Sequence, residues 1–210
     1  MSQDLYPPAL RQFLGHCRFR TYPADTVLIN AGDPSDRLFY LVRGSVSVVI
    51  EDDRGHEIVL AYLNEGEFFG EIGMFDERNE RSAWVSSRTE VEVAQVRYET
   101  LRSLARENPE VVFRLMVQLS QRLRHTNQKV GDLAFTDTSG RVARSLLELA
   151  KQPEAALHSR GIRVRVTRHE LARIAGCSRE MVSRVLRTLE ERGMIAMIGR
   201  DILVLTPLAC

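Results

Sequence analysis

The chain has 210 residues, of which 44% are apolar and 27% charged, as in an ordinary soluble globular protein. No apolar run approaches the ~20 residues that span a bilayer. The first residues lack the basic and then apolar stretch of a signal peptide, so we expect a cytoplasmic protein with no membrane partner. The net charge is +1, but residues 136–210 carry 13 Lys and Arg against 8 Asp and Glu. A basic C-terminal third indicates contact with a polyanion, although basic surfaces are often only solvated.

The cysteines and histidines exclude further classes of protein. Cys17, Cys177 and Cys210 are scattered and odd in number, which excludes a disulfide framework and leaves no clustered metal ligands. We expect them to be structural thiols. The five histidines are equally dispersed, with no pair at the helical spacing of metal ligands. Because no nucleophile–base constellation is visible either, we expect no metal and no enzyme.

After a short amphipathic helix expected at residues 5–14, the chain from about residue 20 to 98 has the pattern of β-structure. Short runs rich in Val, Ile, Phe and Tyr are separated by turn residues. Many short strands at regular spacing predict a sandwich or jelly roll. The expected strands are 26–29, 38–42, 45–50, 57–63, 84–86 and 91–96.

From Tyr98 the apolar period becomes that of a helix, and a long helix is expected from Pro109, a residue suited to a first turn. Seven residues then recur at spacings of three and four, the pattern of a coiled-coil seam over about three heptads. The narrow stripe with polar flanks favours a dimer seam, and a helix packed on its own domain is the alternative. The seam residues are Val112, Leu115, Leu119, Leu123, Thr126, Val130 and Leu133.

The C-terminal third predicts a helix-turn-helix followed by a hairpin. Asp137 is a good N-cap for a helix at 140–151, which places a domain boundary near residue 136, and 153–161 is expected to be a loop. Thr167 and Glu170 have the spacing of a capping box, and the helix they start ends at Gly176. Ser178 caps a second helix, whose inner face is apolar. The segments 195–198 and 202–205 around a Gly-Arg-Asp turn predict a wing.

The exposed start of the second helix carries side chains that can recognise bases. Arginine can make two hydrogen bonds to guanine, and glutamate can accept from the cytosine amino group. This end of the helix is the part that enters the major groove in a helix-turn-helix, although an ordinary charged helix face is the alternative. The sequence therefore predicts double-stranded DNA as a partner. The expected contact residues are Thr167, Arg168, Ser178, Arg179, Glu180, Ser183 and Arg184.

Residues 70–84 predict an anion pocket. Gly70 and Gly73 allow backbone N–H groups to approach an anion, and a short helical turn between them directs its positive end at it. Arg81 can pair with one phosphate. Glu71 is badly placed for a phosphate, so we expect it to accept from a sugar hydroxyl. The combination describes a cyclic nucleotide, and a simple turn with a Glu–Arg ion pair is the alternative.

Over nearly its full length the chain resembles the bacterial cyclic-AMP receptor proteins, or catabolite activator proteins, of the CRP/FNR superfamily of transcription regulators. The stretches that carry this resemblance are Gly44-Ser45-Val46, Tyr62-Leu63-Asn64, Gly70-Glu71, Glu80-Arg81-Ser82-Ala83-Trp84-Val85, Lys129-Val130-Gly131, Leu133-Ala134-Phe135, Ala150-Lys151-Gln152-Pro153 and Gly176-Cys177-Ser178-Arg179-Glu180.

The resemblance implies an α+β protein: a β jelly-roll cyclic-nucleotide-binding domain at 1–108, a dimerisation helix at 109–135 and a winged helix-turn-helix DNA-binding domain at 136–210. It implies a homodimer that binds cyclic AMP as an allosteric ligand, recognises palindromic promoter DNA and contacts RNA polymerase. Glu71 would hold the ribose 2′-hydroxyl, Arg81 and Ser82 the cyclic phosphate, and Thr126 with Asn127 of the partner subunit the adenine edge. The expected ligand residues are Gly70, Glu71, Ile72, Arg81, Ser82, Thr126 and Asn127.

Several residues depart from the family pattern. Asn127 stands where the family has a small hydroxyl residue, and Thr136 replaces a large apolar residue at the hinge. The loop that touches RNA polymerase in the family is altered at Leu157, Ser159 and Arg160, whereas Arg18 and Arg20 keep a second such surface basic. The alternatives are a regulator that responds to cyclic di-GMP or cyclic GMP, or one that depends only weakly on its ligand.

The remaining relatives of this superfamily fit less well. The intact Glu71, Arg81 and Ser82 favour cyclic AMP over the other nucleotides. An iron–sulfur oxygen sensor would need a cysteine cluster, and a kinase-type nucleotide module would lack the helix-turn-helix.

Overall fold

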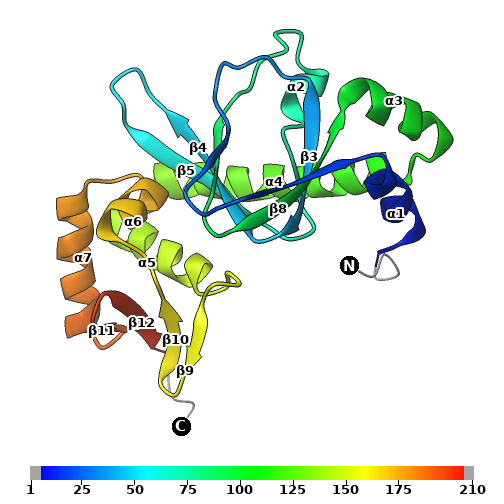
Figure 1. Ribbon diagram of the computed structural model, residues 1–210. Coiled ribbons are helices and arrows are strands. Elements are labelled where there is room, and N and C mark those ends of the chain that lie inside the picture. Colours follow the sequence, from blue (N-terminus) through cyan, green and yellow to red (C-terminus); the bar gives the residue numbers. More distant parts are fainter. Residues whose placement is uncertain (1–5, 206–210) are drawn as a thin grey trace. The chain divides into compact units, whose positions relative to one another are not determined.

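The computed structural model describes residues 6–205, so Leu5 and Cys210 lie outside it, and the chain divides into two compact units between Thr126 and Asn127. The helices of the N-terminal unit are α1 (Pro8–Gly15), α2 (Ile72–Phe75), α3 (Tyr98–Glu107) and the first part of α4 (Glu110–Phe135) (Figure 1). Its strands are β1 (Arg18–Tyr22), β2 (Val27–Ile29), β3 (Arg37–Arg43), β4 (Ser45–Glu51), β5 (Glu57–Asn64), β6 (Phe68–Phe69), β7 (Trp84–Ser87) and β8 (Val91–Arg97).

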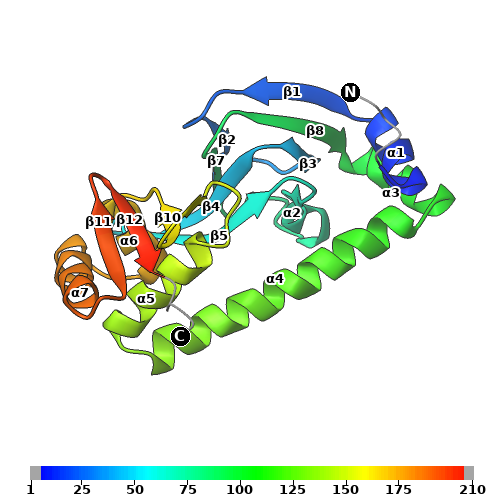
Figure 2. The same cartoon turned by 90° about the horizontal axis from the view of Figure 1, so that it is seen from below.

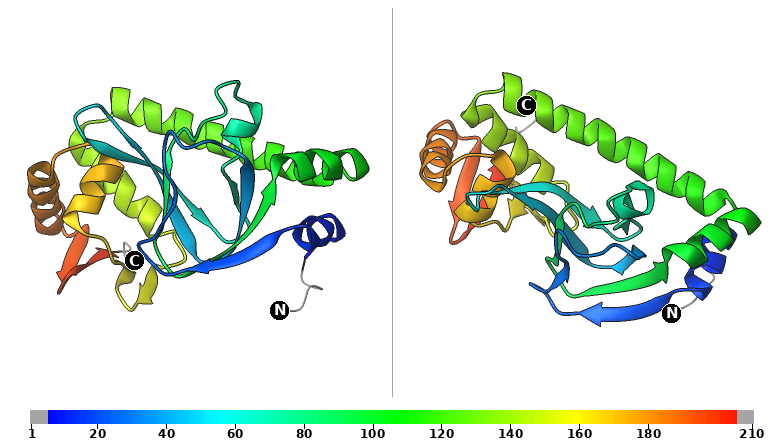
Figure 3. Two further views of the ribbon diagram at one scale, coloured as in Figure 1. Left: turned by 45° about the horizontal axis from the view of Figure 1, so that its top comes forward. Right: turned by 90° about the horizontal axis from the view of Figure 1, so that it is seen from above.

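These strands form two antiparallel sheets that make the expected jelly roll. One sheet has the order β1-β8-β3-β6 and the other β2-β7-β4-β5. Figure 3 shows β1 and β8 side by side at the outer edge of this unit. The order places β6 at an edge of its sheet, directly before the segment in which we expect the ligand site.

Strand β3 is buried on both faces, and its alternating side chains enter two different cores. Phe39 and Leu41 point between the sheets, where they meet Val46, Leu63 and Val85. Leu38, Tyr40 and Val42 point to the other face, which is covered by helices α1, α3 and α4. The second core contains Phe13 of α1 and Phe68 of β6, whose rings meet edge to face at 5.4 Å. The helices of this unit therefore pack against the outer face of the sheet that contains β6.

The C-terminal unit begins with the last part of α4 and continues with helices packed on a small sheet (Figure 1). Strands pair in the order β11-β12-β10-β9, and the β11–β12 hairpin, red in Figure 1, is the expected wing. Leu146, Leu171, Val182 and Leu203 are among its fully or nearly fully buried side chains. Its elements are α5 (Thr138–Leu149), β9 (Ala156–His158), β10 (Gly161–Val164), α6 (Arg168–Ala175), α7 (Arg179–Glu191), β11 (Ile195–Ile198) and β12 (Asp201–Leu205).

The structure differs from the sequence expectations in several places, and strands β1 and β6 are not among the expected strands. The segment 153–161 is not only a loop, because β9 lies within it and pairs with β10. Strand β6 has two residues, too few for an alternating pattern. Leu115 of α4 is 3% exposed and belongs to the core of its own unit together with Val111, so it does not lie in an exposed seam. In each case the partner that decides the structure lies elsewhere in the chain or on another face.

Helix α4, whose ribbon is seen along its length in Figure 2, also carries a second apolar stripe. Phe113, Met116, Val117 and Leu123 are each 55–63% exposed.

Among residues 6–205, no helix has the length and apolar character needed to cross a membrane.

Candidate functional site

Arg81 is held inside the N-terminal unit by oxygen atoms from three segments. Its guanidinium donates to the Arg37 carbonyl at 3.1 Å and to the Gly70 carbonyl at 2.9 Å. It also donates to the Tyr98 hydroxyl at 3.2 Å and lies 5.5 Å from the centre of the Phe39 ring. The Tyr98 hydroxyl is shared further with the Gly70 carbonyl and with the Ser35 hydroxyl. The arginine is therefore fixed by groups that are far apart in the sequence.

The charge of Arg81 has only neutral partners among residues 6–205. The residue is 8% exposed, so water compensates little of the cost of burying its charge. Carbonyl dipoles and an aromatic face stabilise a cation, but a buried charge is normally paired with an opposite one. This position is therefore favourable for an anionic ligand.

Gly70 permits this arrangement because it lacks a side chain. Its φ is +77°, a conformation that favours glycine, and a Cβ there would lie 2.8 Å from an Arg81 nitrogen. Gly73 is equally constrained, since a Cβ would lie 2.2 Å from the Ser35 hydroxyl. The two glycines are required by close packing in this segment.

Glu71 is 4% exposed and is paired with helix α4. Arg122 donates to its carboxylate at 3.1 Å, and the same guanidinium donates to the Phe68 carbonyl. Gln118, one turn earlier on α4, contacts the backbone of Phe68 as well. Glu71 is thus a buried acceptor held by an arginine.

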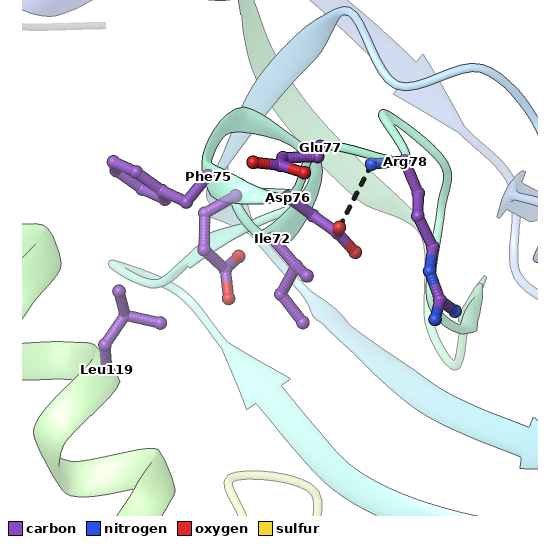
Figure 4. Close-up of a pocket in the computed structure, with 7 residues that line it drawn as sticks. Ile72, Phe75, Asp76, Glu77, Arg78 and Leu119 are labelled. Carbon is purple, nitrogen blue, oxygen red and sulfur yellow. Dashed lines mark hydrogen bonds between the residues drawn. The ribbon is translucent and has the colours of Figure 1, made fainter.

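A cleft of about 530 Å³ opens next to Glu71, between α2 with its following turn and helix α4 (Figure 4). Figure 4 shows Phe75, Asp76 and Glu77 on one side and Leu119 of α4 on the other. The Arg78 backbone N–H donates to the Asp76 carboxylate at 3.1 Å, which closes the turn. The structure therefore brings Glu71 to an open cleft, whereas Arg81 is not one of the residues that line it.

The other expected ligand residues are placed as follows. Ile72 lines the cleft and is 50% exposed, and Ser82 is exposed beside Arg81. Thr126 is exposed on α4, one turn beyond Arg122. Asn127 is exposed at the start of the second unit. The structure brings Gly70, Glu71 and Arg81 together, and it leaves Thr126 and Asn127 without a described contact to them.

The helix-turn-helix forms as the capping residues predict. The Thr167 hydroxyl accepts from the Glu170 N–H at 3.1 Å, and the Ser178 hydroxyl accepts from the Met181 N–H at 3.2 Å. Between the helices, Gly176 has φ 61° and ψ 52°, a left-handed C-cap whose N–H donates to Ala172. The turn is thus defined by local hydrogen bonds. Asp137 likewise caps α5 by accepting from Gly140 at 2.8 Å.

The start of α7 presents the expected polar face. Arg179, Glu180 and Arg184 are exposed, whereas Val182 and Val185 are buried on the opposite side. Ser183 is half-buried, and its hydroxyl donates to the Arg179 carbonyl at 3.0 Å. Thr167 and Arg168 are exposed at the start of α6. These residues form a surface that can contact a polyanion.

Glu180 is held in its charged form. A hydrogen bond from its own backbone N–H and a second from the Ser178 hydroxyl lower the pKa of its carboxyl below the ordinary value of a glutamate. The nearby charge of Arg179 adds to this effect. The carboxylate is therefore a hydrogen-bond acceptor at neutral pH.

The thiols have the character of structural residues. Cys17 donates to the Phe13 carbonyl at 3.3 Å, and burial raises the pKa of its thiol to about 12. Burial raises the pKa of Cys177 as well. Among residues 6–205, no three His, Cys, Asp or Glu side chains are grouped as ligands for a metal ion.

Three residues of this region are not identified by sequence reasoning. Tyr98 and Gln118 give no local signal, because their partners lie 28 and 50 residues away. Arg122 has in the sequence only the character of a polar flank of the helix. Its position one turn before Thr126 is the one available sign that it faces the ligand segment.

Two known domain families match the chain. The cyclic nucleotide-binding domain matches residues 19–108, and the Crp-like helix-turn-helix domain matches residues 140–209. Among similar proteins, the cAMP-activated global transcriptional regulator CRP of Escherichia coli is 47% identical over 197 residues, 94% of each chain. The cAMP-activated global transcriptional regulator Vfr of Pseudomonas aeruginosa is 48% identical over 198 residues, 93% of this chain and 92% of the relative.

The chain is also similar to solved structures of transcription regulators. The c-di-GMP responsive global regulator CLP of Xanthomonas campestris has a TM-score of 0.89 and 40% identity, and the match covers 94% of this chain and 98% of that one. A CRP/FNR-family transcriptional regulator of Thermus thermophilus has a TM-score of 0.78 and 28% identity, with 90% and 94% covered.

A substitution at the cap of α7 tests the electrostatics of Glu180. We expect Ser178→Ala to raise the pKa of Glu180, because one of the hydrogen bonds to the carboxylate is lost. Since the pKa is lowered in the folded state, the stabilisation is present above the ordinary glutamate pKa and is lost as the pH falls through the folded value. NMR titration of the carboxyl carbon measures the shift, and loss of the cap itself costs about 1 kcal/mol. Thr167→Ala removes the cap of α6 and serves as the control. A Glu180 pKa that is unchanged in Ser178→Ala would contradict this account.

Proposed function

The chain belongs to the CRP/FNR family of transcription regulators, and we propose that it is a homodimeric regulator that binds promoter DNA when cyclic AMP occupies its N-terminal unit. Its DNA-binding surface is a helix-turn-helix and its ligand domain a cyclic nucleotide-binding domain. The relatives from Escherichia coli and Pseudomonas aeruginosa are named as cAMP-activated, and their high identity supports the same ligand here.

The observation that carries the ligand assignment is the nearly buried charge of Arg81, whose partners among the described residues are all neutral. A cyclic phosphate supplies the missing negative charge, and the adjacent exposed Ser82 can donate to it. Glu71 cannot favour a phosphate but can accept from a ribose hydroxyl. A cyclic nucleotide satisfies both groups at once. We propose Gly70, Ile72 and Thr126 as further contacts, with Asn127 of the partner subunit at the base.

The proposed DNA contacts follow from the exposed face of α7. Arg179 and Arg184 would each read a guanine, and the ionised Glu180 would accept from a cytosine amino group. Thr167, Arg168, Ser178 and Ser183 would contact the backbone or adjacent base edges. Dimers of this motif bind two half-sites one turn of DNA apart, a spacing that is known from this family and carried over here, and their twofold symmetry gives a palindromic operator.

The homodimer is supported by the exposed apolar stripe on α4. Phe113, Met116 and Leu123 recur at the spacing of a coiled-coil seam when Ser120 is included, and the next position in that series is Asn127. Exposed apolar side chains of this size are costly unless another surface covers them. A second copy of the same helix covers them and brings Asn127 to the ligand site of its partner.

The proposal also covers the division of the chain, its cellular location and its protein partner. We propose the functional division 1–108, 109–135 and 136–210, a cytoplasmic location and no enzymatic activity. RNA polymerase is the proposed protein partner, in accordance with the family. The exposed Arg18 and Arg20 and the 92% exposed Leu157 are candidate contacts for it.

A second ligand is supported by one comparison. The regulator CLP, which is 40% identical and structurally similar, is described as responsive to c-di-GMP. Cyclic di-GMP is therefore the competing candidate, and cyclic GMP is the third. Titration of the wild-type protein with the three nucleotides distinguishes them.

The first prediction concerns Arg81. Arg81→Leu should lower cyclic-AMP affinity by at least a hundredfold, because removing one partner of a buried ion pair costs ~3–5 kcal/mol. The same change removes bonds to Gly70 and Tyr98, so Arg81→Lys, which keeps the charge, is measured beside it. Calorimetric titration gives the affinities, and circular dichroism checks the fold. Near-unchanged affinity in a folded Arg81→Leu protein would rule out this role.

The second prediction concerns base reading by Glu180. Glu180→Ala should cost ~1–3 kcal/mol of binding to the preferred site and relax selectivity at one base pair of each half-site. Glu191→Ala, at the far end of α7, is the matched control because this carboxylate is also exposed. Gel shifts with a set of single-base variants measure both effects. If Glu180→Ala weakened all sequences equally, Glu180 would position the protein and would not read sequence.

The third prediction concerns Asn127. A carboxamide can accept from the adenine amino group, and it also has two N–H donors that can face the guanine carbonyl after a flip. We therefore expect cyclic AMP to remain the activator but cyclic GMP to be rejected less strongly than in Asn127→Ser. Binding and gel-shift titrations with both nucleotides give the preference ratio. An identical ratio in wild type and variant would mean that Asn127 points to solvent and does not affect selectivity.

A further inference from the structure

The carboxamide of Gln118 binds both backbone polar groups of Phe68. Its oxygen accepts from the Phe68 N–H at 2.9 Å, and its nitrogen donates to the Phe68 carbonyl at 2.8 Å. Phe68 belongs to β6, the edge strand next to β3. An edge strand leaves N–H and C=O groups without a neighbouring strand, and such groups are costly when buried. The Gln118 side chain therefore takes the place that a further strand would occupy.

These contacts join helix α4 to the segment that leads into the ligand site. Phe68 is 2% exposed, so its hydrogen bonds with Gln118 are shielded from water. Three residues later comes Glu71, which is held by Arg122 on the next turn of α4 at 3.1 Å. Gln118 and Arg122 are thus two successive contacts between one face of α4 and the chain on either side of Phe69.

The same helix face continues to the expected base contact. Gln118, Arg122 and Thr126 are spaced by four residues, so they lie on one face of α4. A nucleotide held by Glu71 through its ribose and by Thr126 through its base would lie beside Arg122, one turn beyond the contact of Gln118 with Phe68. The alignment of β6 along α4 therefore sets whether both ends of the ligand are reached together.

We propose that Gln118 is a positioning residue, which fixes strand β6 along helix α4 so that a ligand at Glu71 acts on the helix. The inference rests on the proposed cyclic-nucleotide function. Without Gln118, Glu71 can still accept from the ligand, but the segment is then held to α4 by the contacts of Arg122 and by the apolar packing of Phe68. Ligand occupancy is then transmitted less completely to the helix and to the DNA-binding unit that follows it in the chain.

The test is the ratio of operator affinity with saturating cyclic AMP to that without it, measured by fluorescence anisotropy on the full-length protein. We expect Gln118→Leu to lower this ratio about tenfold, the effect of losing two ordinary hydrogen bonds. By linkage, the enhancement of cyclic-AMP affinity by DNA falls by the same factor. Gln118→Glu keeps the acceptor for the Phe68 N–H but places a carboxylate oxygen against its carbonyl, so the ratio falls here too. Gln121→Leu, an exposed glutamine on the same helix, should leave the ratio unchanged.

The outcomes separate this inference from the function on which it rests. A purely structural role would lower the unfolding temperature of Gln118→Leu or Gln118→Glu but leave the ratio of the folded protein at the wild-type value, and that result overturns the inference alone. Wild-type protein that binds no cyclic nucleotide overturns the proposed function and the inference with it. If Gln118→Leu does not fold, Gln118→Glu decides. Hydrogen exchange at the Phe68 amide is a further check, since protection that persists in Gln118→Glu and Gln118→Leu means that other groups hold β6.

Discussion

A nearly buried guanidinium surrounded by neutral groups is the central constraint of the N-terminal unit. Arg81 is placed by the carbonyls of Arg37 and Gly70 and by the Tyr98 hydroxyl, which come from a strand, the ligand segment and the start of a helix. These groups orient the arginine but do not neutralise it. The close approach of Gly70, which a Cβ would prevent, is a consequence of this arrangement. Arg81 thereby ties three separate segments of the unit together.

The second organising element is helix α4, which has two functions on two faces. One face, with Val111, Leu115, Gln118 and Arg122, belongs to the jelly roll. Another carries Phe113, Met116 and Leu123, which are exposed in a single chain. Because the two faces belong to one rigid helix, a change in how the jelly roll contacts the first face alters the position of the second. Under the proposed function, this geometry would allow a bound nucleotide to act on the contact between the two subunits.

How far the sequence predicts the structure depends on the range of the interaction. The caps at Asp137, Thr167 and Ser178 involve partners three residues away, so their motifs are sufficient. The partners of Arg81 lie 11 to 44 residues away and the partner of Gln118 lies 50 residues away, and nothing local identifies them. The residue types of Glu71 and Arg81 indicate their chemistry, but not that Arg122 holds the first or that neutral oxygens hold the second.

The seam on α4 illustrates a different limit. Apolar residues recur at three and four on both faces of this helix, so periodicity cannot tell which stripe meets the protein's own core. The expected set therefore mixes Leu115, which is buried, with Leu123, which is exposed. Only the packing of the jelly roll against one stripe separates the two.

The different exposure of the two arginine sites means that ionic strength acts on them unequally. Arg81 is enclosed, so mobile ions would screen the proposed interaction of its charge with a phosphate only weakly. Arg179 and Arg184 are exposed, and contacts between such residues and DNA displace condensed counterions, which makes binding fall steeply with salt. A rise in cellular salt would therefore leave the sensing of the nucleotide nearly intact while weakening the occupancy of the operator. Under the proposed function, the concentration of ligand and the ionic composition of the cell would thus be separate inputs to the same protein.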